Sequence, residues 1–428
     1  MSEWSGRVEP AVLPLSLRRN FSWTFAGNVV YAASQWGMLV VLARVGTPEM
    51  VGQFALGLAV TAPIILFANL ALRQVQATDA RREYAFGEYF GLRIVTTLLA
   101  LAVIGVVALT AYQNETVLVI GLVGLAKAFE ALSDVVYGLL QQHERMDRIA
   151  QSMMIKGPVS LVALAAGVGL IGGVIGGVIG LVLVWGLIFA LYDLRSARRL
   201  LGTDPRPRWN PRRLGQLAWL ALPLGFVAML ISLNTNIPRY FVERYLGEAQ
   251  LGIYAAMAYL IVAGNTVVSA LGQSASPRLA AYYAEGNRRA YGRLLGRLLA
   301  IGAGLGLAGV LGALLAGEWV LNLLYGPEYA AEAGVFVWIM VAAGISYLAS
   351  FMGYGVTAAR VFALQLILSG IPALAAAGLS VLLIPDGGLQ GAAMVLVFSS
   401  LVNWMLKLVT VLWIMKKETL ILDTQEVV

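Results

Sequence analysis

The sequence contains no cysteine and only one histidine, His143. Without cysteine the chain forms no disulfide bond and no thiolate metal site. A lone histidine also excludes a zinc site built from several histidines, and the segment His143–Asp147 lacks the second histidine of an HExxH motif. We therefore predict no metal centre, no other cofactor and no catalytic residue, and we do not expect an enzyme.

Nucleotide-binding motifs are also missing or out of place. No GxxxxGK[ST] phosphate-binding loop occurs, so we expect no ATP hydrolysis by this chain. GxGxxG occurs at Gly167–Gly172 and at Gly304–Gly309, and both copies lie inside apolar stretches. A dinucleotide-binding loop needs a preceding strand, whereas small residues in apolar helices allow close helix packing. We interpret both copies as helix-packing segments.

Charge is scarce. Charged residues make up 12% of the 428 residues and hydrophobic residues 59%, with a mean hydropathy of +0.79. Soluble domains carry about 25% charged residues. A helix needs roughly 20 apolar residues to cross a hydrocarbon core about 30 Å thick. About a dozen such helices with short loops would use nearly the whole chain. We predict an all-α polytopic membrane protein.

Twelve apolar stretches, each bounded by charged residues, proline or glycine, are predicted as transmembrane helices. They cover residues 20–44, 50–71, 89–112, 116–140, 149–170, 174–192, 214–238, 249–272, 294–316, 332–356, 360–383 and 389–414. The glycine-rich segment 171–180 leaves little room for a turn between the fifth and sixth stretches. A single broken helix there would make the count odd.

The distribution of Lys and Arg predicts the topology. Most of the 30 cationic residues, Lys156 among them, fall on segments that lie on one side of the membrane when successive spans alternate in direction. Arg44, Arg239 and Arg244 lie at or near the other side. Cationic loops stay in the cytoplasm, so we expect twelve spans with both termini cytoplasmic and a break within residues 171–180. The net charge of +7 follows from the same tendency, and we expect no nucleic-acid partner.

The longest predicted cytoplasmic connection is the basic, proline-rich segment 193–215. It separates a predicted N-terminal lobe, residues 1–192, from a C-terminal lobe, residues 216–428, with six spans each. The halves are similar at an offset of 200, where Gly52 corresponds to Gly252. Two six-helix bundles with a substrate site between them are a common transporter plan. The longest predicted external loop, 239–250, is short.

The fourth predicted span carries a polar stripe. Lys127, Glu130, Asp134, Tyr137 and Gln141 are spaced by 3, 4, 3 and 4 residues, which places them on one helical face. A charge in hydrocarbon costs about 2.5–3.5 kcal/mol on insertion scales, so it normally faces water or a partner. Two interpretations remain open: the stripe lines a water-filled cavity, or Lys127 and Glu130 form a structural ion pair.

Further polar residues occupy the leading spans of both halves. Such residues also form ordinary interhelical hydrogen bonds, but their recurrence in both halves favours a shared polar cavity. The predicted cavity lining, besides Glu130, Asp134 and Tyr137, comprises Asn28, Tyr31, Gln35, Asn69, Arg73, Asn236, Asn265 and Gln273.

Cations within or at the ends of the spans outnumber the carboxylates there. They are Arg44, Arg93, Lys127, Arg239 and Lys407, against Glu130 and Asp134. A cationic cavity suits an anionic substrate, and arginine matches the geometry of phosphate oxygens. We therefore predict that these five cations form a substrate-binding cavity.

Four segments carry a family resemblance: Val45–Val60 with its Gly-x-Phe-Ala core, Leu139–Gln151, Tyr245–Met257 and Val320–Met340. In this order and spacing the chain resembles the polysaccharide-transporter branch of the multidrug/oligosaccharidyl-lipid/polysaccharide flippase superfamily, and within it the O-antigen-type flippases. The resemblance implies two six-helix lobes arranged as a V, alternating access, and a location in a bacterial or archaeal cytoplasmic membrane.

The same resemblance implies the substrate and the driving force. The substrate would be an undecaprenyl-diphosphate-linked oligosaccharide, moved from the inner to the outer leaflet. The energy would come from an H+ or Na+ gradient or from the membrane potential. Membrane lipid and other polysaccharide-assembly proteins would be partners. The resemblance assigns the five cations only a general role, the binding of diphosphate or acidic sugars.

Three other functions remain open on sequence grounds. A cation-coupled multidrug exporter of the same superfamily would need a buried carboxylate early in the chain, and residues 20–44 contain none. Glu130 or Asp134 would have to substitute for it. A membrane glycan polymerase or ligase would need a large external loop, which the sequence lacks. A solute importer is the third alternative.

Overall fold

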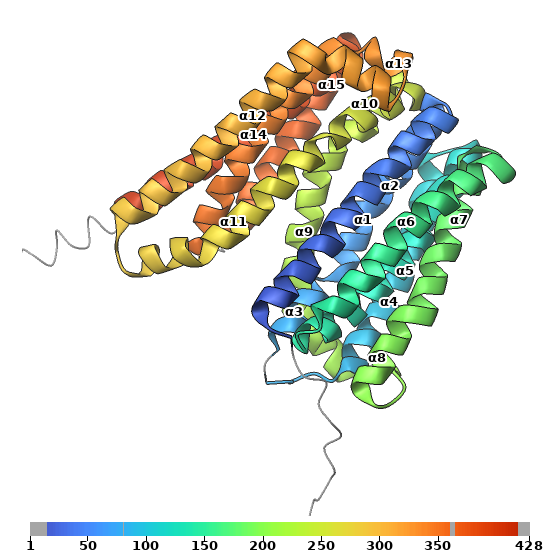
Figure 1. Cartoon of the computed structure of the whole chain (residues 1–428), viewed down its shortest axis with the longest axis vertical. Coiled ribbons are helices and arrows are strands. Elements are labelled where there is room, and N and C mark those ends of the chain that lie inside the picture. Colours follow the sequence, from blue (N-terminus) through green and yellow to red (C-terminus); the bar gives the residue numbers. More distant parts are fainter. Residues whose placement is uncertain (1–14, 80, 360–363, 418–428) are drawn as a thin grey trace, which may run out of the picture. The chain divides into compact units, whose positions relative to one another are not determined.

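The computed structural model describes residues 15–79, 81–359 and 364–417, which form helices and turns without a β-strand. Figure 1 labels the elements. They are α1 (Leu17–Val45), α2 (Pro48–Asn69), α3 (Leu72–Thr78), α4 (Phe86–Ala111), α5 (Asn114–Gln142), α6 (Met146–Leu170), α7 (Gly173–Ile188), the π-helix η1 (Phe189–Asp193), α8 (Leu194–Leu201), α9 (Pro211–Leu246), α10 (Glu248–Tyr259), α11 (Ile261–Ala284), α12 (Arg288–Leu324), α13 (Pro327–Ala330), α14 (Ala333–Ala358) and α15 (Gln365–Lys417).

Eleven helical stretches of the described chain are long and apolar enough to cross a membrane. The last, α15, has 53 residues, or about 80 Å at 1.5 Å per residue, far more than one crossing needs. Gly388 interrupts it with φ 55° and ψ −141°. A Cβ on Gly391 would overlap the carbonyl of Leu383, so the chain folds back there. α15 therefore holds two spans, which brings the number of spans in the described residues to twelve, as predicted. Residues 360–363 of the predicted eleventh span lie outside the described residues.

The predicted break between the fifth and sixth spans is confirmed. α6 ends at Leu170, and α7 begins at Gly173. Gly172 and Gly173 have φ values of 89° and 64°, which glycine adopts without strain. A Cβ on Gly167 would overlap the carbonyl of Gly176, so the two helices pack at glycine contacts. The interpretation of the first GxGxxG segment as a helix-packing segment is confirmed.

Residue contacts divide the chain into two compact units. Unit 1 comprises residues 1–38 and 64–225, and unit 2 comprises residues 39–63 and 226–428. The chain therefore passes between the units within α1, α2 and α9. The boundaries of two moving lobes, 1–192 and 216–428 with the linker 193–215, remain a prediction.

Unit 1 is organised around α5, which contacts α3, α4, α6, α7, η1 and α8. One side of α5 is apolar: Val135, Val136 and Leu139 are buried in a core that also contains Tyr89 of α4 and Leu217 of α9. This packing fixes the rotation of α5 about its axis. The polar stripe of the same helix is thereby directed at α1, α3, α4 and α6.

In unit 2, α14 lies against α11, α12 and α15. The sequence repeat at Gly52 and Gly252 is a reciprocal helix contact within this unit. A Cβ on Gly52 would overlap the carbonyl of Glu248, and a Cβ on Gly252 would overlap the carbonyl of Pro48. Gln53 Nε2 donates to Glu248 Oε2 at 2.9 Å beside the contact. The predicted external loop 239–250 is helical apart from Gly247, which alone separates α9 from α10.

Replacing Gly52 by Ala should therefore destabilise the protein, because a carbonyl occupies the position of the new methyl group. Overpacking costs about 1–3 kcal/mol. Gly304→Ala in α12 is a matched control, since no atom lies within 4 Å of its Cβ position. Thermal unfolding of the purified protein measures both. Equal melting temperatures for the two variants would contradict the close contact.

Candidate functional site

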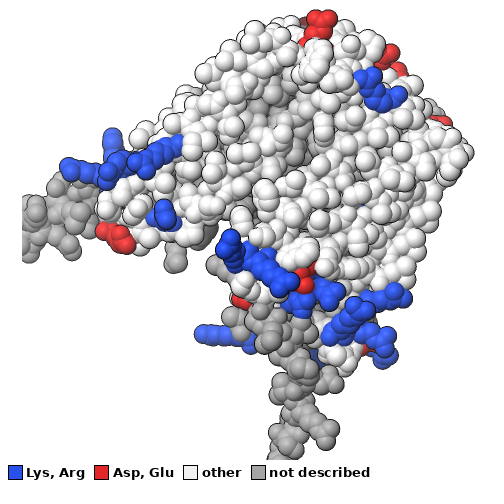
Figure 2. Space-filling view, in the orientation of Figure 1, with Lys and Arg blue, Asp and Glu red and all other residues white. Residues whose placement is uncertain are grey.

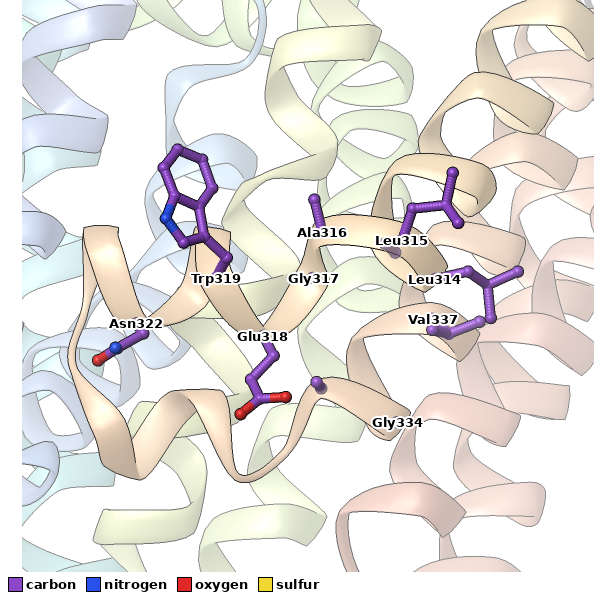
Figure 3. Close-up of a pocket in the computed structure, with 11 residues that line it drawn as sticks. Leu314, Leu315, Ala316, Gly317, Glu318, Trp319, Asn322, Gly334 and Val337 are labelled. Carbon is purple, nitrogen blue, oxygen red and sulfur yellow. The ribbon is translucent and has the colours of Figure 1, made fainter.

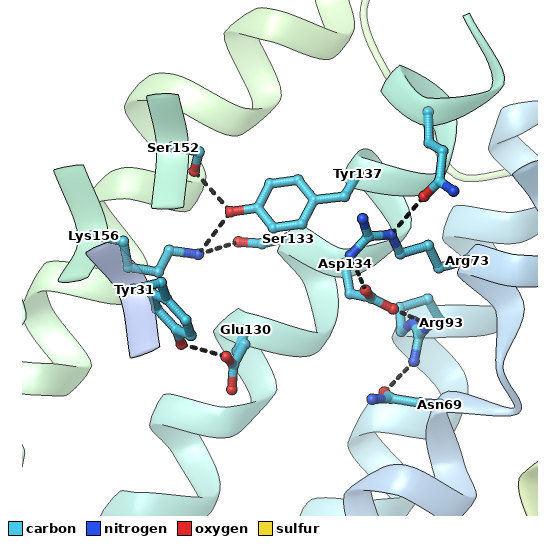
Figure 4. A network of polar contacts seen from close by, with 11 residues as sticks. Tyr31, Asn69, Arg73, Arg93, Glu130, Ser133, Asp134, Tyr137, Ser152 and Lys156 are labelled. Atoms are coloured by element: carbon cyan, nitrogen blue, oxygen red, sulfur yellow. Dashed lines mark hydrogen bonds and ion pairs between the residues drawn. The ribbon is translucent and has the colours of Figure 1, made fainter. Parts of the chain in front are cut away.

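The polar stripe of α5 is the centre of a hydrogen-bonded network in unit 1 (Figure 4). Glu130 Oε2 accepts from Lys127 Nζ at 2.7 Å, and Glu130 Oε1 accepts from the Tyr31 hydroxyl of α1 at 2.5 Å. Lys127 Nζ also lies 5.1 Å from the ring centre of Trp185. The side chains of Lys127 and Glu130 are 22% and 30% exposed. The structural pair that the sequence left open is present, and its charged groups remain partly accessible.

Asp134 is shared by two arginines. Its oxygens lie 3.5 Å from Arg73 Nη1 and 3.3 Å from Arg93 Nη2. Arg93 is fully buried and also donates to Asn69 Oδ1. Arg73 is 28% exposed and donates from Nε to Gln141 Oε1 at 3.0 Å. One carboxylate between two guanidinium groups leaves a surplus positive charge, which Arg73 presents at the accessible side.

A strained backbone turn places Asn69 and Arg73. α2 ends at Asn69, and α3 begins at Leu72. Between them Leu70 and Ala71 have φ values of 49° and 48°. Left-handed conformations cost non-glycine residues about 1–2 kcal/mol each. The break separates two residues that a continuous helix would stack, and it directs Asn69 to Arg93 and Arg73 to Asp134.

A second set of residues forms a buried ring in unit 1, and of its members the sequence indicates only Tyr137 as a site residue. Asp193 of η1 accepts from Ser152 Oγ at 2.6 Å and from Ser133 Oγ at 2.7 Å. Lys156 Nζ donates to Ser133 Oγ at 3.0 Å and to the Tyr137 hydroxyl at 3.3 Å. Tyr137 and Ser152 close the ring at 2.7 Å. Lys156 and Asp193 themselves lie 3.7 Å apart.

The hydrogen bonds of the ring run from the positively charged donor to the negatively charged acceptor. Both arms of the ring lead from the Lys156 ammonium, through hydroxyl groups, to the Asp193 carboxylate. Figure 4 shows the part of the ring formed by Lys156, Ser133, Tyr137 and Ser152. Each hydroxyl can accept one bond and donate one. Lys156 and Asp193 are 2% and 0% exposed, so this pairing offsets a large desolvation cost. The ring is a satisfied polar core that joins α5, α6 and η1.

The sequence groups Lys156 with the inner segments and makes Asp193 the first residue of the predicted linker. In the structure both side chains lie buried among helices, which the sequence analysis does not anticipate. The signal for Lys156 was its i, i+4 spacing from Ser152 and Ser160 within an apolar stretch. Asp193 ends a π-helix, a feature frequent at functional sites, and no local pattern in the sequence indicated it.

Two of the predicted site cations, Arg239 and Lys407, lie partly buried in the described part of unit 2. Arg239 of α9 donates to Asn236 Oδ1 at 3.2 Å. Asn236 is buried and bonded in turn to Ser232. Lys407 of α15 is partly buried beside Gly353 of α14. Within the described ranges neither cation has a carboxylate within ion-pair distance.

Arg44 has a different environment. It is exposed, and its guanidinium donates to the carbonyls of Asn322 at 2.6 Å, Leu324 at 3.2 Å and Leu323. These carbonyls end α12, where helices leave acceptors unsatisfied and favour positive charge. Arg44 therefore caps α12 within unit 2, a contact that the sequence did not predict.

The remaining predicted cavity residues are distributed over both units. Asn28 is exposed on α1 and bonds to the carbonyl of Thr24, while Gln35 of the same helix is partly buried. Asn265 and Gln273 lie on α11 in unit 2, partly buried and exposed respectively. Across the described residues, His, Asp and Glu nowhere cluster in threes as a metal site would require.

A surface cavity of about 580 Å³ lies in unit 2 between the end of α12 and the start of α14 (Figure 3). Glu318, Trp319 and Asn322 contribute its polar and aromatic lining. None of the predicted site residues lines it. The predicted site therefore rests on the charged side chains of the helices and not on this cavity.

This architecture is that of a multi-pass membrane protein with a known transporter fold. The structure matches an inward-facing multidrug resistance MATE family transporter of the MOP superfamily with a TM-score of 0.75, over 92% of this chain and 99% of that one, at 14% identity. It matches the lipid II flippase MurJ in an inward closed conformation with a TM-score of 0.69, over 92% and 87%, at 12% identity.

The sequence identifies the family. The sequence model described as "Polysaccharide biosynthesis protein" matches residues 17–282, and the chain belongs to this family. The capsular polysaccharide biosynthesis protein CapF of Staphylococcus aureus is 28% identical over 386 residues, which cover 90% of this chain and 96% of that protein. The resemblance drawn from the short segments is confirmed.

Breaking the buried ring should destabilise the protein strongly. Lys156→Gln leaves the Asp193 carboxylate buried without its counter-charge, and we expect a loss of about 3–5 kcal/mol in the free energy of unfolding. The double variant Lys156→Gln/Asp193→Asn also lacks the carboxylate charge, and it should recover most of the lost stability. Denaturant unfolding followed by circular dichroism measures both.

The control is the exposed pair Arg198–Asp204, whose charged groups lie 3.1 Å apart. Arg198→Gln should cost less than about 1 kcal/mol, because solvent screens exposed ion pairs. A Lys156→Gln variant as stable as Arg198→Gln would show that the ring contributes nothing to the stability of unit 1.

Proposed function

We propose that this protein is a flippase that moves an undecaprenyl-diphosphate-linked oligosaccharide from the inner to the outer leaflet of a bacterial or archaeal cytoplasmic membrane. The substrate would be a repeat unit of a surface polysaccharide, O-antigen-like or capsular. Membership of a polysaccharide biosynthesis family and a fold shared with a lipid II flippase support this proposal. The observation that carries it is an excess of interior positive charge.

The excess is distributed unevenly. In unit 1, Arg73, Arg93, Lys127 and Lys156 face three carboxylates, so one positive charge is left over. In unit 2, Arg239 and Lys407 have no carboxylate partner in the described chain. Each phosphate of a diphosphate diester is negatively charged, and guanidinium and ammonium groups are its usual partners in proteins. The interior charge therefore complements a diphosphate head group.

The physical chemistry of the substrate explains the need for a protein. Sugar hydroxyls and phosphate charges cannot be solvated by hydrocarbon, whereas the polyprenyl tail already resides there. We propose that the head group occupies the polar interior while the tail stays in the bilayer. The two predicted lobes, 1–192 and 216–428, would expose this interior to each side in turn.

The driving force follows from the charge of the cargo. Moving one charge through 100 mV involves about 2.3 kcal/mol. An anion leaving a negative interior moves down this potential, and an H+ or Na+ gradient would be the alternative source. Membrane lipid and other polysaccharide-assembly proteins are the proposed partners, and no nucleic acid is.

The structure weakens the rival interpretation as a cation-coupled multidrug exporter. That function would assign Glu130 or Asp134 to the coupling cation. Glu130 is bonded to Lys127 and Tyr31, and Asp134 is bonded to two arginines. A polymerase or ligase would need an external catalytic platform, whereas the connection between α9 and α10 is the single residue Gly247.

The proposal is tested with purified protein in vesicles that contain a polyprenyl-diphosphate-linked oligosaccharide with a short prenyl chain. An imposed membrane potential should increase the appearance of its sugar in the opposite leaflet, as detected by a membrane-impermeant lectin. The rate should not depend on ATP. Export of a cationic drug without oligosaccharide movement would favour the multidrug exporter.

The unit 2 cations should matter through their charge. Arg239→Gln and Lys407→Gln should each lower the initial flipping rate about 10–100-fold, because a charge-assisted hydrogen bond contributes about 1.5–3 kcal/mol. Lys407→Arg should keep most of the rate. Arg293→Gln, at an exposed position of α12, is the matched control and should have wild-type activity. Normal rates for both interior variants would exclude a substrate role for these cations.

A further inference from the structure

The connection between α8 and α9 is fixed to α4. Residues 202–210 are not helical, and the Arg208 backbone N–H donates to the Gly87 carbonyl at 2.7 Å. A Cβ on Gly87 would lie 2.7 Å from the carbonyl oxygen of Arg206, and a Cβ on Gly91 would lie 2.7 Å from that of Arg208. Two glycines one helical turn apart therefore form the groove that receives this segment.

The start of α9 holds the segment from its other end. Arg213 Nε donates to Glu88 Oε1 at 3.0 Å, and its Nη2 donates to the Glu83 carbonyl. The guanidinium of Arg213 also lies 4.6 Å from the ring centre of Tyr84. The segment between α8 and α9 is thus anchored within unit 1 at residues 206–208 and at Arg213.

This anchoring leaves a basic surface facing outward. We call it the basic shelf, and it consists of Arg195, Arg198, Arg199, Arg206, Arg208, Trp209 and Arg212, all exposed. The side chains of Arg198 and Arg206 are 68% and 84% exposed, and Asp204 is the one carboxylate between them. Trp209 is 57% exposed. Figure 2 shows Lys and Arg gathered at the end of unit 1 where Figure 1 places α8.

We propose that the basic shelf binds the phosphate headgroups of anionic phospholipids in the leaflet that it faces. That leaflet is the cytoplasmic one in the topology on which the proposed function rests. A Lys or Arg near an anionic membrane surface contributes about 1 kcal/mol, and guanidinium groups bind phosphate through two hydrogen bonds. Because the backbone is already fixed, binding orders little additional chain.

The position of the shelf favours lipid over a soluble polyanion. α4, to which the segment is fixed, and α9, which follows it, are both apolar enough to cross a membrane. Trp209 precedes α9, and Trp219, ten residues further along, is 77% exposed. Tryptophan is enriched at membrane interfaces, with its ring at the level of the headgroups. The positive-inside tendency accounts for the charge of the segment between α8 and α9. It does not account for the packing of this segment against Gly87 and Gly91, which holds its backbone in place.

The test measures fluorescence quenching of Trp209 by brominated lipids in vesicles containing the full chain. The Trp209 signal is the difference between wild type and Trp209→Phe. Brominated phosphatidylglycerol should quench this signal at least several-fold more than brominated phosphatidylcholine at equal mole fraction. The preference should disappear in Arg206→Gln/Arg208→Gln/Arg212→Gln and at high salt, because screening weakens the attraction.

The matched control is Arg289→Gln/Arg293→Gln/Arg297→Gln, which removes the same charge from unit 2 and should keep the preference. Equal quenching by the two lipids in wild type would overturn the proposal, as would equal loss of preference in both triple variants. Flipping of the oligosaccharide is measured in the same vesicles. A preference for phosphatidylglycerol without flipping would support lipid binding by the basic shelf and contradict the flippase function. Flipping without this preference would support the flippase function and contradict lipid binding by the basic shelf.

Discussion

The rest of unit 1 depends on one constraint: a charge inside a membrane-spanning bundle must be paired. Hydrocarbon cannot solvate an unpaired ammonium or carboxylate, so each charge on α5 needs a partner from another helix or from a neighbouring turn. Glu130 bonds to Lys127 and to Tyr31 of α1, and Asp134 bonds to arginines of α3 and α4. These pairs hold α5 in register with its neighbours. The apolar side of α5 packs into the core, and its polar side cannot rotate away.

The same constraint explains why cations without a carboxylate partner in unit 2 indicate a binding site for an anion. A protein pairs its structural charges, as unit 1 does around Asp134 and Asp193. Arg239 and Lys407 lack such partners in the described chain of unit 2. An interior cation that no carboxylate neutralises is costly unless a ligand or water satisfies it. In the proposed function, a cargo with a diphosphate would provide that neutralisation each time it binds, and its departure would leave the site ready for the next molecule.

Much of the fold could be predicted from sequence because apolar length and the distribution of arginine are local signals. The α5 stripe could be predicted from spacing alone. Its partners could not, since Tyr31 and Arg93 are remote in sequence and their approach depends on packing. The burial of Lys156 is not evident from its position among the cations of the sequence, because that position carries no information on packing. The capping of α12 by Arg44 depends on a contact 280 residues away, which no periodicity reveals.

The most direct measurement of the central claim is made in cells depleted of the protein. Lipid-linked oligosaccharides are extracted, and their leaflet is determined with a membrane-impermeant reagent that modifies the sugar. Failure of flipping should cause a polyprenyl-diphosphate-linked oligosaccharide to accumulate in the inner leaflet, while its synthesis continues. Normal distribution of every such lipid between the leaflets after depletion would contradict the account.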